Sequence, residues 1–475
     1  MKIAAKRRII KMKPKSVFSK EGLTKIQAIA IIAIIVIAII AGGVYYYITT
    51  SPKVEGVHIK VGIIMPLTGA LAPLGKPTFE GIKAAIDLIN ERGGVLGKYP
   101  VDYVVADSKS DPAVAKSEAE RLCTVEGVQV IIGSYSSGLA STVVKVTEQY
   151  KVVLWETGGT FSSLTLQGYK YLLRPLYVSE DWGALGVFYL KDVVAPKLDK
   201  DPKDIKVVLL HEDSAFGQSL ATGVEEACSK YGFDLVSVES YPYTTTDMSG
   251  IITKLKGLEF DVILHAGYFT DTVLFLRQSK ELGLKFPVII GYGVGYGIMD
   301  LWETFGEDIE YFNVIDWPNF YFVDHIKDPE IKAIAEEFKE RMIAYFGSEI
   351  ISDTHVYTGF ALVLPLFTHI LPHTIEKYGE VTPDNIMKAA YEVEVPKDED
   401  PYCSGVKFSS PENPADTWVG EIIRADNPQS HVGQNLIGTY YGYQWIDGEL
   451  KPVWPEEVKV VEPVIPLPET SPFSP

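Results

Sequence analysis

Two loops of small and hydroxylated residues contain the groups best suited to binding a small anion. The first spans residues 133–138 (GSYSSG), after an apolar run and before a helical pattern. Free backbone N–H groups at a helix start, with hydroxyls beside them, form a site for a carboxylate or another anion. Capping of that helix by Ser136 or Ser137 is the alternative, and it requires no ligand. The second loop, residues 156–160 (ETGGT), follows the next apolar run, so both loops should open on the same edge of a parallel sheet.

Other patterns that could carry chemistry argue against catalysis. His211 and Glu212 begin a zinc-protease motif, but Ala215 stands where its second histidine is required. The glycine run at residues 291–297 lacks the spacing of a dinucleotide-binding fingerprint, and the sequence contains no phosphate-binding P-loop. We therefore expect neither an enzyme nor a cofactor nor a metal site.

Alternating strands and helices are expected to position these loops. Apolar runs predict strands and apolar residues at helical spacing predict helices, and the pattern restarts after residue 174. Such alternation is typical of an α/β fold with two doubly wound parallel sheets. The expected strands are 58–65, 101–107, 128–133, 152–155, 205–210, 234–241, 261–265, 287–290, 436–445 and 450–454. The expected helices are 77–91, 112–124, 138–150, 181–193, 215–231, 248–258, 270–282, 329–346, 354–378 and 382–390.

The first 57 residues have a different composition. Residues 26–47 carry no charged side chain and are long enough to span a bilayer as a helix. Nine Lys and Arg precede them against one acid, Glu21, so the positive-inside rule places residues 1–25 in the cytoplasm and everything after the helix outside the cell. A cleaved signal peptide is the alternative. The expected localisation is a single-pass anchor in the cell membrane, followed by a linker at 48–57.

The amino-acid composition limits the classes of protein to which this chain can belong. The 475 residues are 47% hydrophobic and carry 62 Asp and Glu against 44 Lys and Arg, with a net charge of −18. This is ample material for two globular lobes, and its acidity makes nucleic acid an unfavourable partner. The three cysteines, Cys123, Cys228 and Cys403, allow at most one disulfide. Residues 455–475 are rich in proline and are expected to form an extended, poorly ordered tail.

A longer stretch, residues 61–98, carries a family resemblance. Its motifs are Pro66-Leu67-Thr68-Gly69, Gly75, residues 81–86, Ile89-Asn90, Gly93-Gly94 and Gly97. This spacing resembles the opening of the extracellular ligand-binding proteins of ABC importers for branched-chain amino acids, amides and urea. The resemblance implies a type I periplasmic-binding fold, in which three crossings of the chain join two lobes around a cleft. It would put 58–178 and about 316–408 in one lobe, and 179–315 and about 409–454 in the other.

The resemblance also implies which residues bind ligand. In amino-acid binders of this family, the positions that match Ser137, Gly158 and Thr160 hold the ligand carboxylate, beside the loop at Thr68-Gly69. Phe216 and Tyr268 match aromatic positions of the other lobe. Tyr135, Trp155, Phe269 and Tyr292 near the proposed cleft favour an apolar or aromatic moiety, with ordinary core packing as the alternative for each.

Two departures from the family pattern concern the ligand ammonium. Amino-acid binders place Glu near Gly293, and often Asp at the position of Ser179, and this chain has neither. A buried ammonium without a countercharge is costly. Either a nearby acid takes over that pairing or the ligand has no ammonium. The candidate acids are Glu156, Glu180, Asp181 and Asp271.

These observations predict a membrane-anchored extracellular solute-binding protein. It would deliver a small solute (an amino acid, an amide or a related small carboxylate or aromatic compound) to an ABC permease and its ATPase by closure of the cleft. An extracellular sensor domain that reports ligand occupancy to a separate signalling partner is the alternative.

Overall fold

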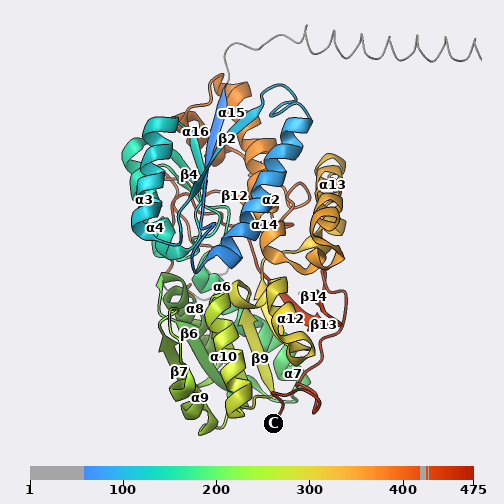
Figure 1. Ribbon diagram of the computed structural model, residues 1–475. Helices are drawn as coiled ribbons and strands as arrows, with labels where there is room; N and C mark the ends of the chain where they lie inside the picture. The colour runs from blue at the N-terminus through green and yellow to red at the C-terminus, as the bar shows by residue number, and fades with distance from the viewer. Residues whose placement is uncertain (1–57, 418–423, 426) are drawn as a thin grey trace, which may run out of the picture. The chain divides into compact units, whose positions relative to one another are not determined.

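The computed structural model describes residues 58–417, 424–425 and 427–475. The predicted membrane helix at 26–47, the basic segment before it and the linker after it lie outside the described residues. The described strands form a five-stranded sheet, a seven-stranded sheet and a separate pair, β11 (Glu394–Val395) with β12 (Val406–Lys407) (Figure 1).

The five-stranded sheet is entirely parallel, with strand order β2-β1-β3-β4-β5. β3 is buried along its whole length and β1 nearly so, as expected of strands covered on both faces by helices. The first four strands lie within one or two residues of their expected positions, and the two-residue β5 was not predicted. The strands are β1 (Ile59–Met65), β2 (Val101–Asp107), β3 (Val130–Gly133), β4 (Val153–Trp155) and β5 (Leu172–Leu173).

The seven-stranded sheet has the order β14-β13-β10-β9-β8-β6-β7. Its five parallel strands repeat the order of the first sheet, while β13 and β14 are antiparallel and make the sheet mixed. β10 has only two apolar residues, Val314 and Ile315, and was not predicted because so short a run gives no periodic signal. The strands are β6 (Lys206–Glu212), β7 (Asp234–Tyr241), β8 (Val262–Ala266), β9 (Val288–Tyr292), β10 (Asn313–Asp316), β13 (Tyr441–Ile446) and β14 (Glu449–Trp454).

The longer helices follow the predicted order (Figure 1). α2 packs closely on α14, and a Cβ added to Gly81 would lie 2.0 Å from the Val356 carbonyl oxygen, so a side chain there would separate the two helices. The helices that cover the sheets are α2 (Ala72–Glu91), α3 (Pro112–Arg121), α4 (Ser137–Tyr150), α6 (Ser179–Tyr189), α8 (Ala215–Tyr231), α9 (Ser249–Lys256), α10 (Phe269–Leu282), α12 (Met299–Phe305), α13 (Pro329–Phe346), α14 (Thr354–Pro365), α15 (Leu371–Tyr378) and α16 (Pro383–Glu392).

One helical stretch of the described residues is long and apolar enough to cross a membrane. It is Thr354–Tyr378, formed by α14, the π-helical turn Leu366–Ile370 and α15. Of its most apolar window, 89% is buried inside the protein. Its hydrophobicity is therefore explained by its place in the core.

The proline-rich C-terminal segment differs from expectation. It lies against the seven-stranded sheet, where the Phe473 ring stacks on Phe286 at 5.2 Å between ring centroids. The Phe286 N–H donates to the Phe473 carbonyl (2.9 Å), and the Leu467 N–H donates to the Pro287 carbonyl (2.8 Å). Burial of one aromatic ring and pairing of the backbone hold this segment, so it does not form the poorly ordered tail predicted from its proline content.

Candidate functional site

A small cavity lies where loops that follow strands of the two sheets meet. Its free volume is only about 10 Å³, enough for about one water molecule. Its lining combines hydroxyls from one sheet with rings from the other and from the connecting segments. The residues are Tyr135, Ser136, Ser137, Gly158 and Thr160, with Trp182, Phe216, Tyr268, Val294 and Trp317.

Strand order explains why these residues meet. Tyr135 to Ser137 follow β3, and Gly158 and Thr160 follow β4, its parallel neighbour. Phe216, Tyr268 and Val294 follow β6, β8 and β9 in the other sheet. Parallel strands bring their carboxyl ends to one edge, which is where open α/β sheets bind ligands.

The start of α4 presents uncapped donors to this cavity. Ser136 occupies the N-cap position, but its side chain makes no capping hydrogen bond to the helix. The capping role considered for Ser136 is therefore not seen, and the first N–H groups of α4 have no side-chain partner from the cap. Such groups favour an anion, reinforced by the helix dipole.

The hydroxyls of Ser137 and Thr160 are oriented as donors. Ser137 Oγ accepts the Thr160 N–H (3.1 Å) and the Phe161 N–H (3.4 Å). Thr160 Oγ1 accepts the Ser179 hydroxyl (2.7 Å). Since the lone pairs are engaged in this way, both hydroxyl protons are available, and neither has an acceptor among the described residues. Both side chains are at most 2% exposed.

Glu156 holds this polar loop in shape. One carboxylate oxygen accepts the N–H groups of Gly158 (2.9 Å) and Gly159 (2.7 Å), and the other accepts the Ser134 N–H (2.9 Å). Burial raises the pKa of Glu156, while these backbone bonds act in the opposite direction. Glu156 thus fixes the loop backbone from behind and has no oxygen to spare for a cation.

The rest of the cavity wall is aromatic. Trp182 stacks on Tyr440 with 4.4 Å between ring centroids, and its other ring neighbours are Trp317 at 5.5 Å, Phe216 at 5.7 Å and Tyr292 at 6.3 Å. Phe216 lies 5.7 Å from Tyr268. The rings thus form a continuous cluster that lines the same cavity as the hydroxyls.

Sequence reasoning missed Trp182 and Trp317. Trp182 lies in the first turn of α6, and Trp317 follows the unpredicted strand β10. The Trp182 indole N–H donates to the Ile315 carbonyl (2.8 Å), across 133 positions of sequence. No local pattern could reveal that contact.

Several positions expected near the cleft do not line the cavity: Thr68, Gly69, Trp155, Phe269 and Tyr292. Trp155 is fully buried in the core, where its indole N–H donates to the Leu362 carbonyl (3.0 Å) and its ring packs on Phe408. Thr68 is held away from the cavity by Asp107, which accepts its hydroxyl at 2.7 Å. Successive side chains of a strand point to opposite faces of its sheet. Trp155, the last residue of β4, therefore points into a packed face of the sheet and not toward the loop that follows.

The other acids considered as partners for a ligand ammonium all bond to protein groups, although Asp271 Oδ1 has no hydrogen-bond partner among the described residues. Glu180 accepts the hydroxyls of Ser162 and Ser219, and Asp181 pairs with Arg424 at 3.0 Å. Asp271 accepts the Tyr241 hydroxyl at 2.7 Å. Burial raises the pKa of Asp181 to about 7 and that of Asp271 to about 8.

Asp316 occupies the space beside Gly293. A Cβ added to Gly293 would lie 1.8 Å from the Asp316 carboxyl carbon, and one added to Gly297 would lie 1.7 Å from a carboxyl oxygen. Asp316 accepts the Trp317 N–H (2.7 Å) and is bonded to the Thr354 hydroxyl (2.6 Å). Burial raises the pKa of Asp316 to about 8. The glycines make room for this carboxyl group, which was not predicted.

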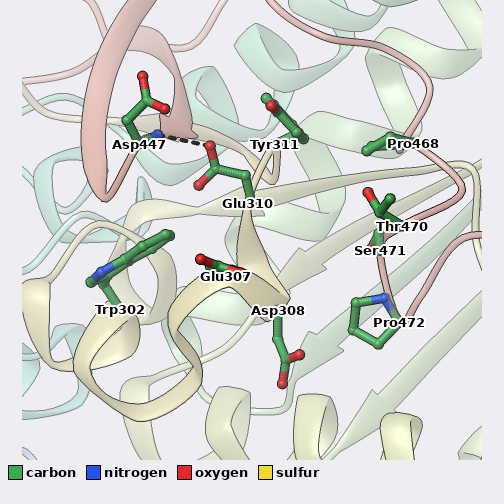
Figure 2. A pocket seen from close by; sticks show the side chains of 10 residues that line it. All are labelled: Trp302, Glu307, Asp308, Glu310, Tyr311, Asp447, Pro468, Thr470, Ser471 and Pro472. Carbon is green, nitrogen blue, oxygen red and sulfur yellow. Dashed lines mark hydrogen bonds between the residues drawn. The ribbon is translucent and has the colours of Figure 1, made fainter.

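A second pocket lies beside the C-terminal segment (Figure 2). Figure 2 shows Glu307, Asp308, Glu310 and Asp447 around it, with the Asp447 N–H donating to Glu310 (2.7 Å). In the described ranges no group of three or more His, Cys, Asp and Glu side chains is arranged to hold a metal ion. The three cysteines are free.

Comparison with known proteins places this geometry in a family. The sequence profile of the family described as periplasmic binding protein matches residues 58–418. The Leu/Ile/Val-binding protein homolog 8 of Brucella abortus (strain 2308) is 30% identical over 406 residues, covering 85% of this chain and 92% of that protein.

Solved structures share the fold. The branched-chain amino acid transporter substrate-binding protein LivJ of Streptococcus pneumoniae, in complex with isoleucine, has a TM-score of 0.64 at 22% identity, covering 86% of this chain and 100% of that one. A solute-binding protein of an ABC transporter from R. palustris, in complex with benzoate, has a TM-score of 0.63 at 16% identity, covering 87% and 98%. The chain therefore belongs to the periplasmic binding protein family, whose members bind solutes in a type I periplasmic-binding fold.

Proposed function

We propose that this protein is a membrane-anchored extracellular solute-binding protein that captures a small carboxylate-bearing solute and delivers it to an ABC permease. The observation that carries the proposal is the pair of buried hydroxyls, Ser137 and Thr160, which accept protein donors, keep their own protons free and line a cavity beside the uncapped start of α4. Donors without a protein acceptor suit an anionic group of a ligand. The names of the relatives, which refer to Leu, Ile and Val, and the bound isoleucine and benzoate of structural neighbours agree with a carboxylate.

The proposed mechanism is closure of two lobes. We assign 58–178 with about 316–408 to one lobe and 179–315 with about 409–454 to the other, each built around one of the two sheets. The hydroxyls then come from one lobe, and Phe216 and Tyr268 from the other. A solute that touches both walls binds the closed arrangement better than the open one and shifts the population toward it.

Attachment to the membrane is assigned to residues 26–47, an uncharged segment of bilayer length after nine basic residues. Anchoring keeps the binding domain near its permease. Protease added to intact cells should degrade the domain and leave an epitope tag at the N-terminus protected. Degradation of both ends, or protection of both, would contradict this orientation.

The test of the carboxylate site compares two matched threonines in one loop. Thr160→Val removes a donor aimed at the cavity. Thr157→Val removes a buried hydroxyl that has no hydrogen-bond partner among the described residues and does not line the cavity. A hydrogen bond to a charged group contributes about 1.5–3 kcal/mol, so Thr160→Val should weaken carboxylate binding roughly 10- to 100-fold.

The readout is isothermal titration of the full chain in detergent with small carboxylates, alongside thermal unfolding. Thr157→Val should bind as the wild type does. If Thr160→Val unfolds the protein, the hydroxyl is structural. If both variants bind equally well, the proposed site is wrong.

A further inference from the structure

We infer that the solute combines a carboxylate with an apolar body and carries no ammonium group. This inference rests on the proposed function and names the substrate class of the same cavity. It separates the protein from binders of α-amino acids, in which an ammonium accompanies the carboxylate.

The first support is the charge of the cavity. None of the ten lining residues is an Asp or a Glu, and the lining oxygens belong to hydroxyls and backbone. An ammonium enclosed there would lose its water and gain no countercharge, which is strongly unfavourable. A carboxylate in the same space meets the hydroxyl protons of Ser137 and Thr160 and the start of α4.

The second support is that three nearby acids are committed to the protein itself. Glu156 accepts three backbone N–H groups, Glu180 accepts two serine hydroxyls and Asp181 pairs with Arg424. Releasing any of them toward a ligand would leave buried partners unsatisfied. None can therefore turn into the cavity at low cost.

The third support is the hydrogen-bond arrangement around Asp316. The Thr354 hydroxyl has one proton and three possible partners within reach, the Gly297 carbonyl (2.9 Å), Asp316 (2.6 Å) and His355 Nδ1 (3.3 Å). Thr354, Gly297 and Asp316 are all satisfied if Asp316 is a neutral acid that donates to Thr354, while Thr354 donates to Gly297. A neutral carboxyl group held in this way supplies no charge for an ammonium, and it fills the space into which a side chain at Gly293 would grow.

The ring walls define the rest of the solute. Trp182, Trp317, Phe216 and Tyr268 line the same cavity as the hydroxyls, so the part of the solute beyond the carboxylate should be apolar. A cage for a quaternary ammonium would need open ring faces. One face of Trp182 is covered by Tyr440, stacked at 4.4 Å with 8° between the planes.

The test uses pairs of compounds that differ only by the ammonium. The full chain in detergent is titrated calorimetrically with 4-methylpentanoate against leucine, and with 3-phenylpropanoate against phenylalanine, together with benzoate and glycine betaine. We expect the ammonium-free member of at least one pair to bind ten or more times as tightly as its amino acid.

The outcomes separate this inference from the proposed function. Tighter binding of leucine or phenylalanine, or of glycine betaine, would overturn the inference and leave the carboxylate site standing. If no carboxylate of either kind binds, the proposed function fails and the inference fails with it. Thr160→Val should weaken the binding of the preferred compound, while Thr157→Val should not, which ties the measured selectivity to this cavity.

Discussion

The parallel strands of the two sheets have the same order, but the loops that they contribute to the cavity carry different kinds of side chain. Loops after β3 and β4 supply hydroxyls and backbone donors, while loops after β6 and β8 supply rings. The polar wall is held by local bonds such as those of Glu156 to Gly158 and Gly159. The aromatic wall is held by contacts between distant segments, such as Trp182 to Ile315.

This difference shows how one topology serves two purposes. Parallel order brings strand ends together in both sheets, and it leaves the residue types that follow each strand free to vary. Hydroxyl donors fix one end of a solute, and rings bury its remainder. Substitutions among the hydroxyls should therefore change the affinity for the carboxylate. Substitutions among the rings should change the preference for one apolar group of the solute over another.

The largest effect on binding is expected for Ser137→Ala in the polar wall. It removes a donor to the carboxylate and the acceptor of the Thr160 N–H, so the affinity for a small carboxylate should fall about 100-fold. Ser141→Ala, one turn along α4, is the matched control and should bind normally, because its hydroxyl donates to the Gly138 carbonyl and does not line the cavity. Equal losses in both variants, measured by calorimetry, would show a general effect on α4.

Phe216→Leu should remove one ring from the cavity lining and leave an apolar side chain in its place. A ring-to-ring contact contributes about 0.5–1.5 kcal/mol beyond its buried area, so a ring-containing carboxylate should bind roughly 2- to 10-fold more weakly. An aliphatic carboxylate of similar size should change less. If both compounds lose affinity equally, Phe216 shapes the cavity as a whole and gives no preference for rings.

Asp316→Asn should change the pH dependence of stability. Burial raises the pKa of Asp316 to about 8, above its value of about 3.9 in an unfolded chain. The stabilisation from the neutral acid is therefore fully present below about pH 4 and is lost as pH rises through about 8. An amide stays neutral, so the variant should lose less melting temperature than the wild type between pH 6 and 9.

The melting temperature of the Asp316→Asn protein should still fall with rising pH, because burial also raises the pKa of other acids, such as Asp271 and Asp353. The exposed Asp398→Asn is the control and should leave the slope as it is. A steeper slope in Asp316→Asn would mean that Asp316 is charged in the folded protein.

The smallest effect on binding is expected for Trp155→Phe. Trp155 lies outside the cavity, so affinity for a carboxylate should stay within about twofold of the wild type. Loss of the hydrogen bond to the Leu362 carbonyl should still cost about 1–3 kcal/mol of unfolding free energy in urea, because a buried acceptor is left without its donor. A tenfold loss of affinity would show that Trp155 contributes to the binding site.

Much of the fold could be predicted from short-range patterns. The first four strands and the helices after them are recognisable because their apolar residues repeat at strand or helix spacing, and these patterns place the hydroxylated loops at strand ends. β10 was not predicted because two apolar residues make no pattern. For the same reason Asp316, at its end, and Trp317, directly after it, were not recognised as residues of the site. The C-terminal segment was misjudged because Phe473 becomes an anchor only when Phe286 is beside it.

The same division holds for the site. The chain's own order of residues established the alternation of strands and helices, the donors at 133–138 and 156–160, and the resemblance that the family match confirms, because each depends on neighbours a few positions apart. The ring wall, the committed state of the acids and the carboxyl group beside Gly293 arose only from folding. They depend on contacts between residues up to 258 positions apart, such as Trp182 with Tyr440, and periodicity carries no information about contacts at that range.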